Sequence, residues 1–473
     1  MNENPVTSED NKSGHMTAGV RTLMGDPKKA ILKLGLPMIL AMSVQTVYNL
    51  VDTFWVSGLG ADSLAAIGFV FPFFMVMIAL STGLGVGAGS AISRKLGARD
   101  KAGADYVAVH SMVIMLVLSV LFTVPMLIFS KQIFMTVGAG KTTELAMDYG
   151  NIIFAGSFVL FFTNVAGAIL RSEGNAKGAM NAMILGAVLN IILDPIFIYP
   201  LGMGMKGAAW ATVLSMAITA VIMAKWLFLD NTTYVSFNFR DFIPNWDIIK
   251  DIFRVGLPAT MQQVTMAMTM LIMNLVIIAV DNTDGVAVYT VGWRVVMIAI
   301  APLIGMGTAV VTVSGFAYGE HSYEKLLDIN SYSIKVGTAI EVVIAVLTFV
   351  FAPQIALAFT QAESAAHIMS DITTFLKIVC IFYPTTAMGL LSSSLFQGVG
   401  KGINSLITTI IRSLIFTPLF AFVFAFYLKM GLTGVWWGLL FGNVLGGLIT
   451  YAWVYFYVRS LQKGSQKGVQ VSR

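Results

Sequence analysis

Long apolar runs alternate with short polar segments along almost the whole chain. Most of these runs exceed about 18 residues, the length that a helix needs to cross the hydrocarbon core of a membrane. The pattern predicts about twelve membrane-spanning helices, six on each side of the polar segment 230–251. The predicted spans are 31–58, 64–92, 104–130, 145–170, 178–200, 207–229, 252–280, 286–316, 331–352, 367–396, 403–428 and 432–458.

The second set of six spans repeats the first. Segment 34–37 (Leu-Gly-Leu-Pro) returns at 255–258 (Val-Gly-Leu-Pro), and segment 174–178 returns at 398–402, in each case about 220 residues later. An even number of spans in each repeat gives both halves the same orientation in the membrane. We therefore predict an all-α membrane protein with two pseudo-symmetric six-helix bundles and a cleft between them, as in secondary transporters.

This pattern divides the chain into five parts. They are an N-terminal tail (1–26), an N-lobe with the first six spans (27–229), an inter-lobe linker (230–251), a C-lobe with the last six spans (252–458) and a basic C-terminal tail (459–473).

Composition and charge placement agree with a membrane protein. Hydrophobic residues make up 57% of the chain and charged residues 11%, whereas a soluble domain is about a quarter charged. Most of the Lys and Arg residues fall in the segments on the side of the N-terminus. Because positive charge collects on the cytoplasmic side, we expect a multi-pass protein of the cell membrane with both termini in the cytoplasm. The net charge of +5 then points to the inner membrane surface and its lipids, with no nucleic-acid partner.

Span 2 contains a glycine-rich segment, 83–89, with glycine at every second position. Small residues four positions apart let two membrane helices approach closely. The segment follows no strand of a soluble domain, and no Gly-Lys-Ser/Thr comes after it, so it lacks the context of a nucleotide-binding loop. We predict that it is a helix-packing surface.

Two aspartates lie inside predicted spans, where an ionised side chain costs roughly 2.5–3.5 kcal/mol even on the mildest scale. Asp52 follows Gln45 and Asn49 on one face of span 1, which makes all three candidates for a polar pocket. Asp194 follows Asn190 by four residues on span 5, at a depth similar to that of Asp52. Two carboxylates in one apolar pocket cannot both stay ionised without a counter-charge, so this pair suits a proton or a sodium ion.

The second half lacks this pair. The repeat places Met273 where the first half has Asp52, and an uncharged residue where the first half has Asp194. We therefore assign the ion site to the N-lobe alone.

The other polar residues of the spans do not form a catalytic pattern. Glu341 in span 9 is the remaining acid there, and we expect it to pair with Lys377 or Arg412. Cys380 is the only cysteine, so neither an intrachain disulfide nor a cysteine-based metal site can form. No Ser/His/Asp set stands out. We expect no cofactor and no enzymatic activity.

Five sequence motifs follow one another along the first half of the chain. They are 35–37 at the start of span 1, 52–58, the glycine-rich segment that runs into 93–97, 171–175, and 194–195. In this order, the motifs resemble those of the multidrug and toxic compound extrusion (MATE) family, and most closely its prokaryotic DinF-like branch. The resemblance covers nearly the whole chain, and the two-half repeat makes the set specific.

The resemblance implies a cation site in the N-lobe. In the DinF-like branch, acids on spans 1 and 5, an Asn one turn earlier on span 5 and a Thr on span 6 form this site. These roles carry over to Asp52, Asp194, Asn190 and Thr212, which would hold a proton or a sodium ion.

Two further positions take their expected roles from the same resemblance. Tyr149 on span 4 would lie near the pocket, and Pro37 would permit a bend in span 1. The NorM-like branch instead carries acids on spans 7 and 10, where this chain has uncharged residues around Met266 and Thr386. This difference favours the DinF-like assignment and a C-lobe without a cation site.

The resemblance implies secondary active multidrug efflux. We expect export of amphipathic, often cationic, small molecules by alternating access in exchange for protons or sodium, carried out by a monomer. The alternative is a lipid or lipid-linked oligosaccharide flippase with the same two lobes, which would need cationic residues clustered in the central cleft. Only Arg294, Lys377 and Arg412 are candidates for such a cluster.

Overall fold

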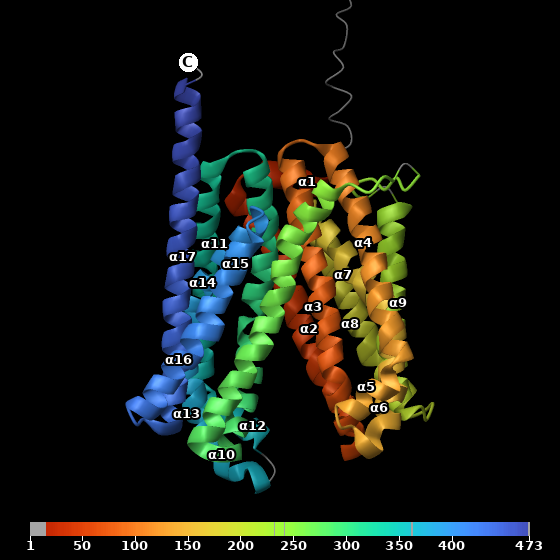
Figure 1. Cartoon of the computed structure of the whole chain (residues 1–473), viewed down its shortest axis with the longest axis vertical. Coiled ribbons are helices and arrows are strands. Elements are labelled where there is room, and N and C mark those ends of the chain that lie inside the picture. The colour runs from red at the N-terminus through yellow and green to blue at the C-terminus, as the bar shows by residue number, and fades with distance from the viewer. Residues whose placement is uncertain (1–15, 231, 241, 361–362, 472–473) are drawn as a thin grey trace, which may run out of the picture.

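The computed structural model is almost entirely helical (Figure 1). It describes residues 16–230, 232–240, 242–360 and 363–471. Within these residues, 11 helices are long and apolar enough to cross a membrane, or up to 12 if one bent pair of helices counts as a span. The chain is therefore a multi-pass membrane protein, as its hydrophobic pattern predicts.

The N-terminal half contains the first six predicted spans. Span 4 consists of two helices, α6 and α7, that meet at an angle of 44°. The elements of this half are α1 (Ala18–Met24), α2 (Pro27–Ser57), α3 (Ala61–Gly97), α4 (Lys101–Ile128), α5 (Ser130–Thr136), η2 (Gly140–Thr142), α6 (Thr143–Ala155), α7 (Ser157–Ser172), α8 (Ala176–Ile198) and α9 (Gly204–Phe228).

The C-terminal half contains the other six. Spans 7 and 8, Trp246–Asp281 and Thr283–Gly319, lie within α10, which reverses direction between them (Figure 1). The elements are α10 (Trp246–Gly319), α11 (Tyr323–Val350), α12 (Ala352–Phe359), η3 (Glu363–Ile368), α13 (Met369–Val379), η4 (Cys380–Phe382), α14 (Tyr383–Gly398), α15 (Gly402–Thr409), the π-helical η5 (Ile410–Phe416), α16 (Thr417–Phe422), the π-helical η6 (Val423–Tyr427) and α17 (Gly431–Val471).

Helix extends into both predicted tails. Within the N-terminal tail, the hydroxyl of Thr17 caps α1 by accepting a hydrogen bond from the N–H of Val20, and Val20 and Leu23 are buried. At the other end, α17 continues through the predicted basic tail as far as Val471. The boundary at 26 therefore coincides with the N-cap of α2, although the short helix α1 precedes it, whereas the boundary at 459 falls inside α17. Residues 1–15 of the predicted tail lie outside the described residues.

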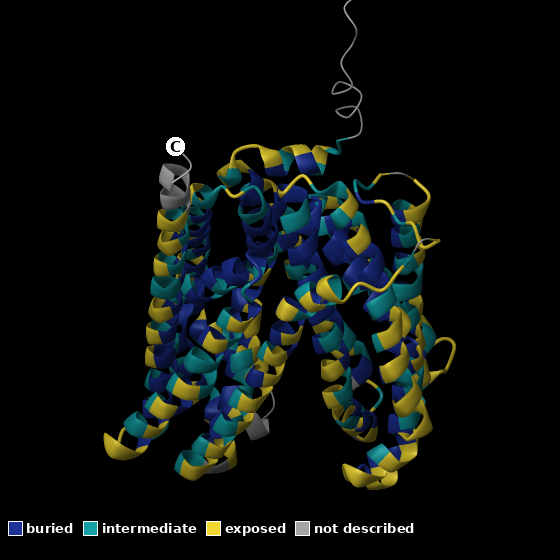
Figure 2. Cartoon of the chain, turned by 45° about the horizontal axis from the view of Figure 1, so that its top comes forward, coloured by how far each residue is buried: buried dark blue, intermediate teal, exposed yellow. Residues whose placement is uncertain are grey.

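The two halves form two bundles that meet on the side of the chain termini and diverge toward the opposite side (Figure 1). We call these the terminal side and the distal side. A buried apolar cluster joins N-lobe side chains to Leu303, Val310 and Phe316 of α10, whereas Tyr289, Phe375 and Trp436 belong to a second cluster within the C-lobe. Figure 2 shows the buried residues gathered where the bundles meet. The lobes therefore share a core on the terminal side only.

The glycine-rich segment of α3 packs closely against α10 of the other lobe, which confirms the predicted helix-packing surface. A Cβ atom on Gly87 would lie 2.3 Å from the carbonyl oxygen of Ile252, and one on Gly83 would lie 2.7 Å from that of Gly256. Near the ends of the same helices, a Cβ atom on Gly97 would lie 2.0 Å from the Phe316 carbonyl oxygen. Because backbone is the obstacle, only glycine permits this separation of α3 and α10.

Polar contacts reinforce the same interface. The guanidinium of Arg94 on α3 pairs with the carboxylate of Asp251 on α10 at 2.7 Å. The hydroxyl of Ser90 donates to the carbonyl oxygen of Gln397 on α14 at 2.6 Å. These contacts lie within one turn of the glycine contacts, so they hold the terminal side closed.

The inter-lobe linker is attached to the N-lobe through a buried carboxylate. Glu173, which follows α7, accepts hydrogen bonds at Oε2 from the N–H groups of Tyr234 at 2.8 Å and Val235 at 3.2 Å. Its Oε1 is buried and has no hydrogen-bond partner in the described chain. Burial raises the pKa of Glu173 from 4.5 to about 8, and the two N–H donors act in the opposite direction.

We predict that Gly87→Ala loosens the terminal side. The added methyl group meets backbone, and overpacking of this kind costs about 1–3 kcal/mol. The distance between spin labels at the exposed residues Lys177 and Glu324 should therefore lengthen and broaden. Gly68→Ala in the same helix is the control, because no atom lies within 4 Å of its added Cβ. Equal distance distributions in both variants would show that the glycine contact does not hold the lobes together.

We predict that Glu173 makes the stability of the fold pH-dependent. A carboxyl whose pKa is raised on folding stabilises the folded state at pH values below 4.5, and this contribution is lost as the pH rises through about 8. Glu173→Gln keeps an acceptor for Tyr234 and Val235 but cannot ionise. The Tm of the wild type minus that of this variant should fall between pH 5 and pH 9, the range set by this shift. A constant difference over that range would contradict the assignment.

Candidate functional site

The predicted acid pair is assembled inside the N-lobe. α2 packs against α8, and α8 packs against α9, which brings Asp52, Asp194 and Thr212 together. The carboxyl groups of Asp52 and Asp194 interact directly with each other. Asp194 is fully buried, whereas Asp52 is partly exposed. The sequence predicts this proximity from depth alone, and the structure places the two side chains as expected.

Asn190 connects the acid pair to α9. With its amide NH2 turned toward Asp194, Asn190 donates to Asp194 Oδ2 at 2.7 Å, and its carbonyl oxygen accepts from the N–H and the hydroxyl of Thr212, each at 3.2 Å. With the amide turned the other way, the NH2 donates to the hydroxyl of Thr212 at 3.2 Å. That orientation sets the carbonyl oxygen against Asp194 Oδ2, so it is favourable only when Asp194 carries a proton.

The pocket leaves one carboxylate oxygen available. Asp194 Oδ1 is buried and meets no donor of the described chain. No Lys or Arg of the described chain forms an ion pair with either aspartate. The negative charge of the pair is therefore not neutralised by the protein itself.

Two tyrosines surround the acid pair. Tyr149 on α6 lies beside both carboxyl groups, as expected. Tyr48 on α2 also lies beside them and close to the side chain of Thr212. The sequence analysis did not include Tyr48, which precedes Asp52 by one helical turn. It assigned only amide and carboxyl side chains of span 1 to the pocket.

The other residues of α2 that the sequence assigns to the pocket or to gating are Gln45, Asn49 and Pro37. Gln45 is half-buried and Asn49 is exposed, and neither side chain forms a hydrogen bond within the described chain. Pro37 lies inside α2, where it removes a backbone donor. It adjoins Met38, whose backbone contacts Gly305 of α10 at the closed terminal side.

An aromatic contact fixes the distal end of α2 over α8. The hydroxyl of Tyr199, which ends α8, donates to the carbonyl oxygen of Trp55 at 2.8 Å. The two rings pack edge to face with centroids 6.3 Å apart. A Cβ atom on Gly58 would lie 2.2 Å from the Tyr199 hydroxyl, so a side chain at that position would displace the tyrosine. The hydrogen bond to Trp55 lies within one turn of Asp52 and joins α2 to the end of α8.

The C-lobe contains no equivalent pair. Met273, the counterpart of Asp52, is fully buried in the apolar cluster of the C-lobe. Glu341 does not form the expected ion pair with Lys377 or Arg412, because both of its carboxylate oxygens are buried without a hydrogen-bond partner in the described chain. The Lys377 ammonium instead lies over the ring of Phe349, 5.8 Å from its centroid.

The oxygen donors of the N-lobe pocket suit a hard monovalent cation or a proton. Among the described residues, no group of three or more His, Cys, Asp or Glu side chains could hold a metal ion.

Comparison with known proteins agrees with this architecture. The profile of the MatE family matches residues 37–196 and 258–423, one match in each lobe. The two matches begin at Pro37 and Pro258, which are equivalent positions of the repeat. The multidrug export protein MepA of Staphylococcus aureus is 28% identical over 377 residues, which cover 79% of this chain and 82% of MepA.

Solved structures share the fold over nearly the whole chain. A MATE crystallised in complex with MaL6 is 48% identical and has a TM-score of 0.92, with 94% of this chain and 100% of that chain covered. A multidrug resistance MATE family transporter of the MOP superfamily in an outward-facing conformation is 47% identical, also has a TM-score of 0.92, and covers 95% of this chain and 99% of its own. The sequence repeat, the two lobes and these matches together show that this chain belongs to the MatE family of multidrug and toxic compound extrusion transporters.

Proposed function

We propose that this protein is a secondary active multidrug exporter that moves amphipathic, often cationic, small molecules out of the cell in exchange for protons or sodium. The observation that carries the proposal is the contact between the carboxyl groups of Asp52 and Asp194 in a pocket without a basic partner in the described chain. Membership of the MatE family and the name of the relative MepA support the substrate class.

The chemistry of the pair provides coupling. Two carboxyl groups in contact, one of them fully buried, are stabilised by one positive charge between them. A proton, a sodium ion held by Asp52, Asn190, Asp194 and Thr212, or the cationic group of a drug can supply it. If these ligands compete for one negative site, binding of one promotes release of another.

The amide of Asn190 links the charge state of Asp194 to α9. An ionised Asp194 accepts from the amide NH2, and a protonated Asp194 donates to the amide carbonyl after the amide turns over. The second orientation also turns the NH2 toward the N–H of Thr212, which makes it the less stable one. Protonation therefore changes the contact between α8 and α9.

The arrangement of the lobes supports alternating access. The lobes are packed together on the terminal side and separate on the distal side (Figure 1). With both termini in the cytoplasm of a cell-membrane protein, this arrangement faces outward. The inward-facing state then requires the α3–α10 glycine contact to open.

The flippase alternative has weaker support. Of the three cations considered for a central cluster, Lys377 packs on a phenylalanine ring and Arg412 lies within the C-lobe, where its guanidinium is next to Gly389 and its stem next to Gly446. Only Arg294 is exposed. The chain therefore does not assemble the group of cations that would hold a pyrophosphate.

We predict that Asp52→Asn and Asp194→Asn each reduce proton- or sodium-driven drug transport by at least about tenfold while the protein stays folded. An asparagine cannot exchange a proton, and it removes half of the negative charge of the pair. The measurement is uptake of a fluorescent cation into proteoliposomes under imposed pH and sodium gradients, with Tm as the check on folding.

Glu341→Gln is the matched control, since it neutralises a buried membrane carboxyl outside the N-lobe pocket. This variant should keep gradient-driven transport. Full transport by Asp52→Asn would show that the ion site lies elsewhere. The same conclusion would follow if Glu341→Gln lost coupling while both aspartate variants retained it.

A further inference from the structure

We propose that Arg294 forms an anion-binding subsite on the C-lobe wall of the inter-lobe cleft, opposite the acid pair of the N-lobe. The cleft would then recognise zwitterionic amphiphiles, whose cationic group is drawn to the N-lobe and whose carboxylate or phosphate is drawn to Arg294. This inference rests on the proposed transport function and narrows its substrate class.

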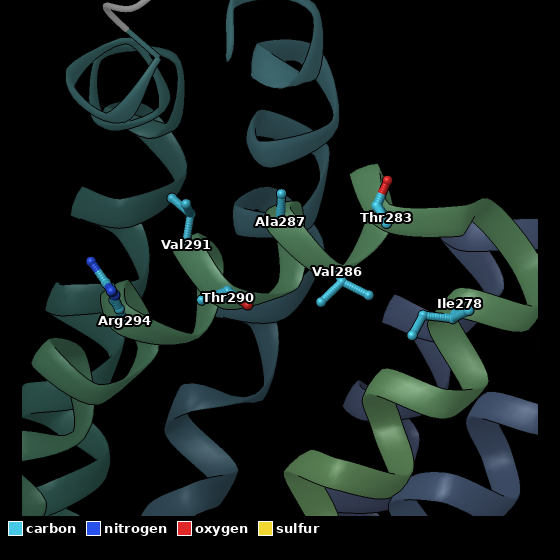
Figure 3. Close-up of a pocket in the computed structure, with 7 residues that line it drawn as sticks. All are labelled: Ile278, Thr283, Val286, Ala287, Thr290, Val291 and Arg294. Carbon is cyan, nitrogen blue, oxygen red and sulfur yellow. The ribbon is translucent and has the colours of Figure 1, made fainter. Parts of the chain in front are cut away.

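Arg294 lines a cavity of about 480 Å³ formed by residues of α10 on both sides of its reversal (Figure 3). The walls are mostly apolar, with Val286 and Val291 among them, and the hydroxyls of Thr283 and Thr290 are the other polar groups. An apolar cavity with one charged group and few hydroxyls is typical of a site for an amphipathic small molecule.

Helix geometry indicates that Arg294 faces the N-lobe. Gly305 of the same span contacts the backbone of Met38 on α2, where a Cβ atom would lie 2.7 Å away. Residues spaced by four or seven positions share one face of a helix. Ile298, Arg294 and Ala287 precede Gly305 at such successive spacings, so they lie on the same face as Gly305. The opposite face contains Tyr289 and Val296, which are buried in the C-lobe cluster. The face that touches α2 on the terminal side therefore continues past Arg294 on the distal side.

Arg294 and the acid pair lie at comparable depth. From the contact between Gly305 and Met38, Arg294 is about 16 Å along α10 toward the distal side, at a rise of 1.5 Å for each residue. Asp52 is about 21 Å along α2 in the same direction. A basic group on one lobe and an acidic pair on the other thus lie on the two sides of the cleft within about one helical turn of each other in depth.

The charge of Arg294 is available to a ligand. The residue is exposed, and no acid of the described chain forms an ion pair with it. Asp284, an acid near the reversal of α10, is paired with His367 at 3.2 Å. A guanidinium binds a carboxylate or phosphate through two parallel hydrogen bonds, which gives orientation as well as attraction.

The test uses two dyes that differ only at this anionic group. Rhodamine 110 has a free carboxylate and is zwitterionic, whereas rhodamine 123 is its cationic methyl ester. Affinities for purified full-length protein in detergent are measured by fluorescence anisotropy. Arg294→Gln should weaken rhodamine 110 binding by about tenfold, as expected for loss of a charge-assisted hydrogen bond, and leave rhodamine 123 binding within about twofold.

Two further variants separate recognition from structure. Arg294→Lys keeps the charge but not the paired donors, so it should retain part of the affinity for rhodamine 110. Met297→Gln, an exposed position of the same helix outside the cavity, should change neither dye. An Arg294→Gln variant that binds both dyes as the wild type does, or that loses both equally, would overturn the subsite.

Failure of this inference can be told apart from failure of the proposed function. If the wild type binds rhodamine 123 and Arg294→Gln changes neither affinity, only the subsite is wrong. If the wild type binds neither dye, the proposed drug binding is wrong as well.

Competition identifies the source of the anion. Phosphatidylethanolamine, a zwitterionic phospholipid, in mixed micelles should displace rhodamine 110 from the wild type but not from Arg294→Gln if the natural group is a lipid phosphate. Displacement by a soluble zwitterionic amphiphile alone, again dependent on Arg294, would identify a soluble ligand. Displacement that is the same in wild type and variant would contradict binding through Arg294.

Discussion

The candidate ion site depends on one contact, that between the carboxyl groups of Asp52 and Asp194 inside the N-lobe. Asp194 is fully buried, Asp52 is partly exposed, and no basic residue of the described chain forms an ion pair with either. The pocket must therefore take up a positive charge from outside the protein. Two contacts surround the pair: the Tyr199–Trp55 hydrogen bond joins α2 to the end of α8, and the Asn190 amide lies between Asp194 and Thr212.

A site of this kind performs transport only if the two lobes can change their contact. The terminal side is closed by glycines that admit no side chain and by one ion pair, Arg94–Asp251. On the distal side the lobes have separate apolar cores. The lobe interface combines close backbone packing at the glycines with an apolar core that both lobes share, so its opening requires a rigid-body separation that exposes this core. Coupling then requires that the charge state of the acid pair favours one lobe arrangement over the other.

Much of the fold follows from hydrophobic length and repeat, because the membrane leaves the chain few other structures. The site was predictable where a charge stands out in an apolar span, as with Asp52 and Asp194. Tyr48 was not, since a tyrosine in a membrane helix is ordinary until its neighbours in space are known. The expected ion pair of Glu341 with Lys377 or Arg412 was wrong for the same reason. The sequence shows that these basic residues lie in spans of the same lobe, but only helix packing decides which side chains they contact. Helix α1 was missed because its buried side chains are few.

The most direct test of the central claim is the affinity of a cationic drug for the purified protein across pH, first without sodium and then with it. If drug, proton and sodium compete for the Asp52–Asp194 pair, affinity should fall by up to about tenfold for each unit of acidification, and added sodium should lower it at alkaline pH. Linkage also requires that drug binding releases protons or sodium to the same extent. Affinity that is indifferent to both pH and sodium would contradict the account.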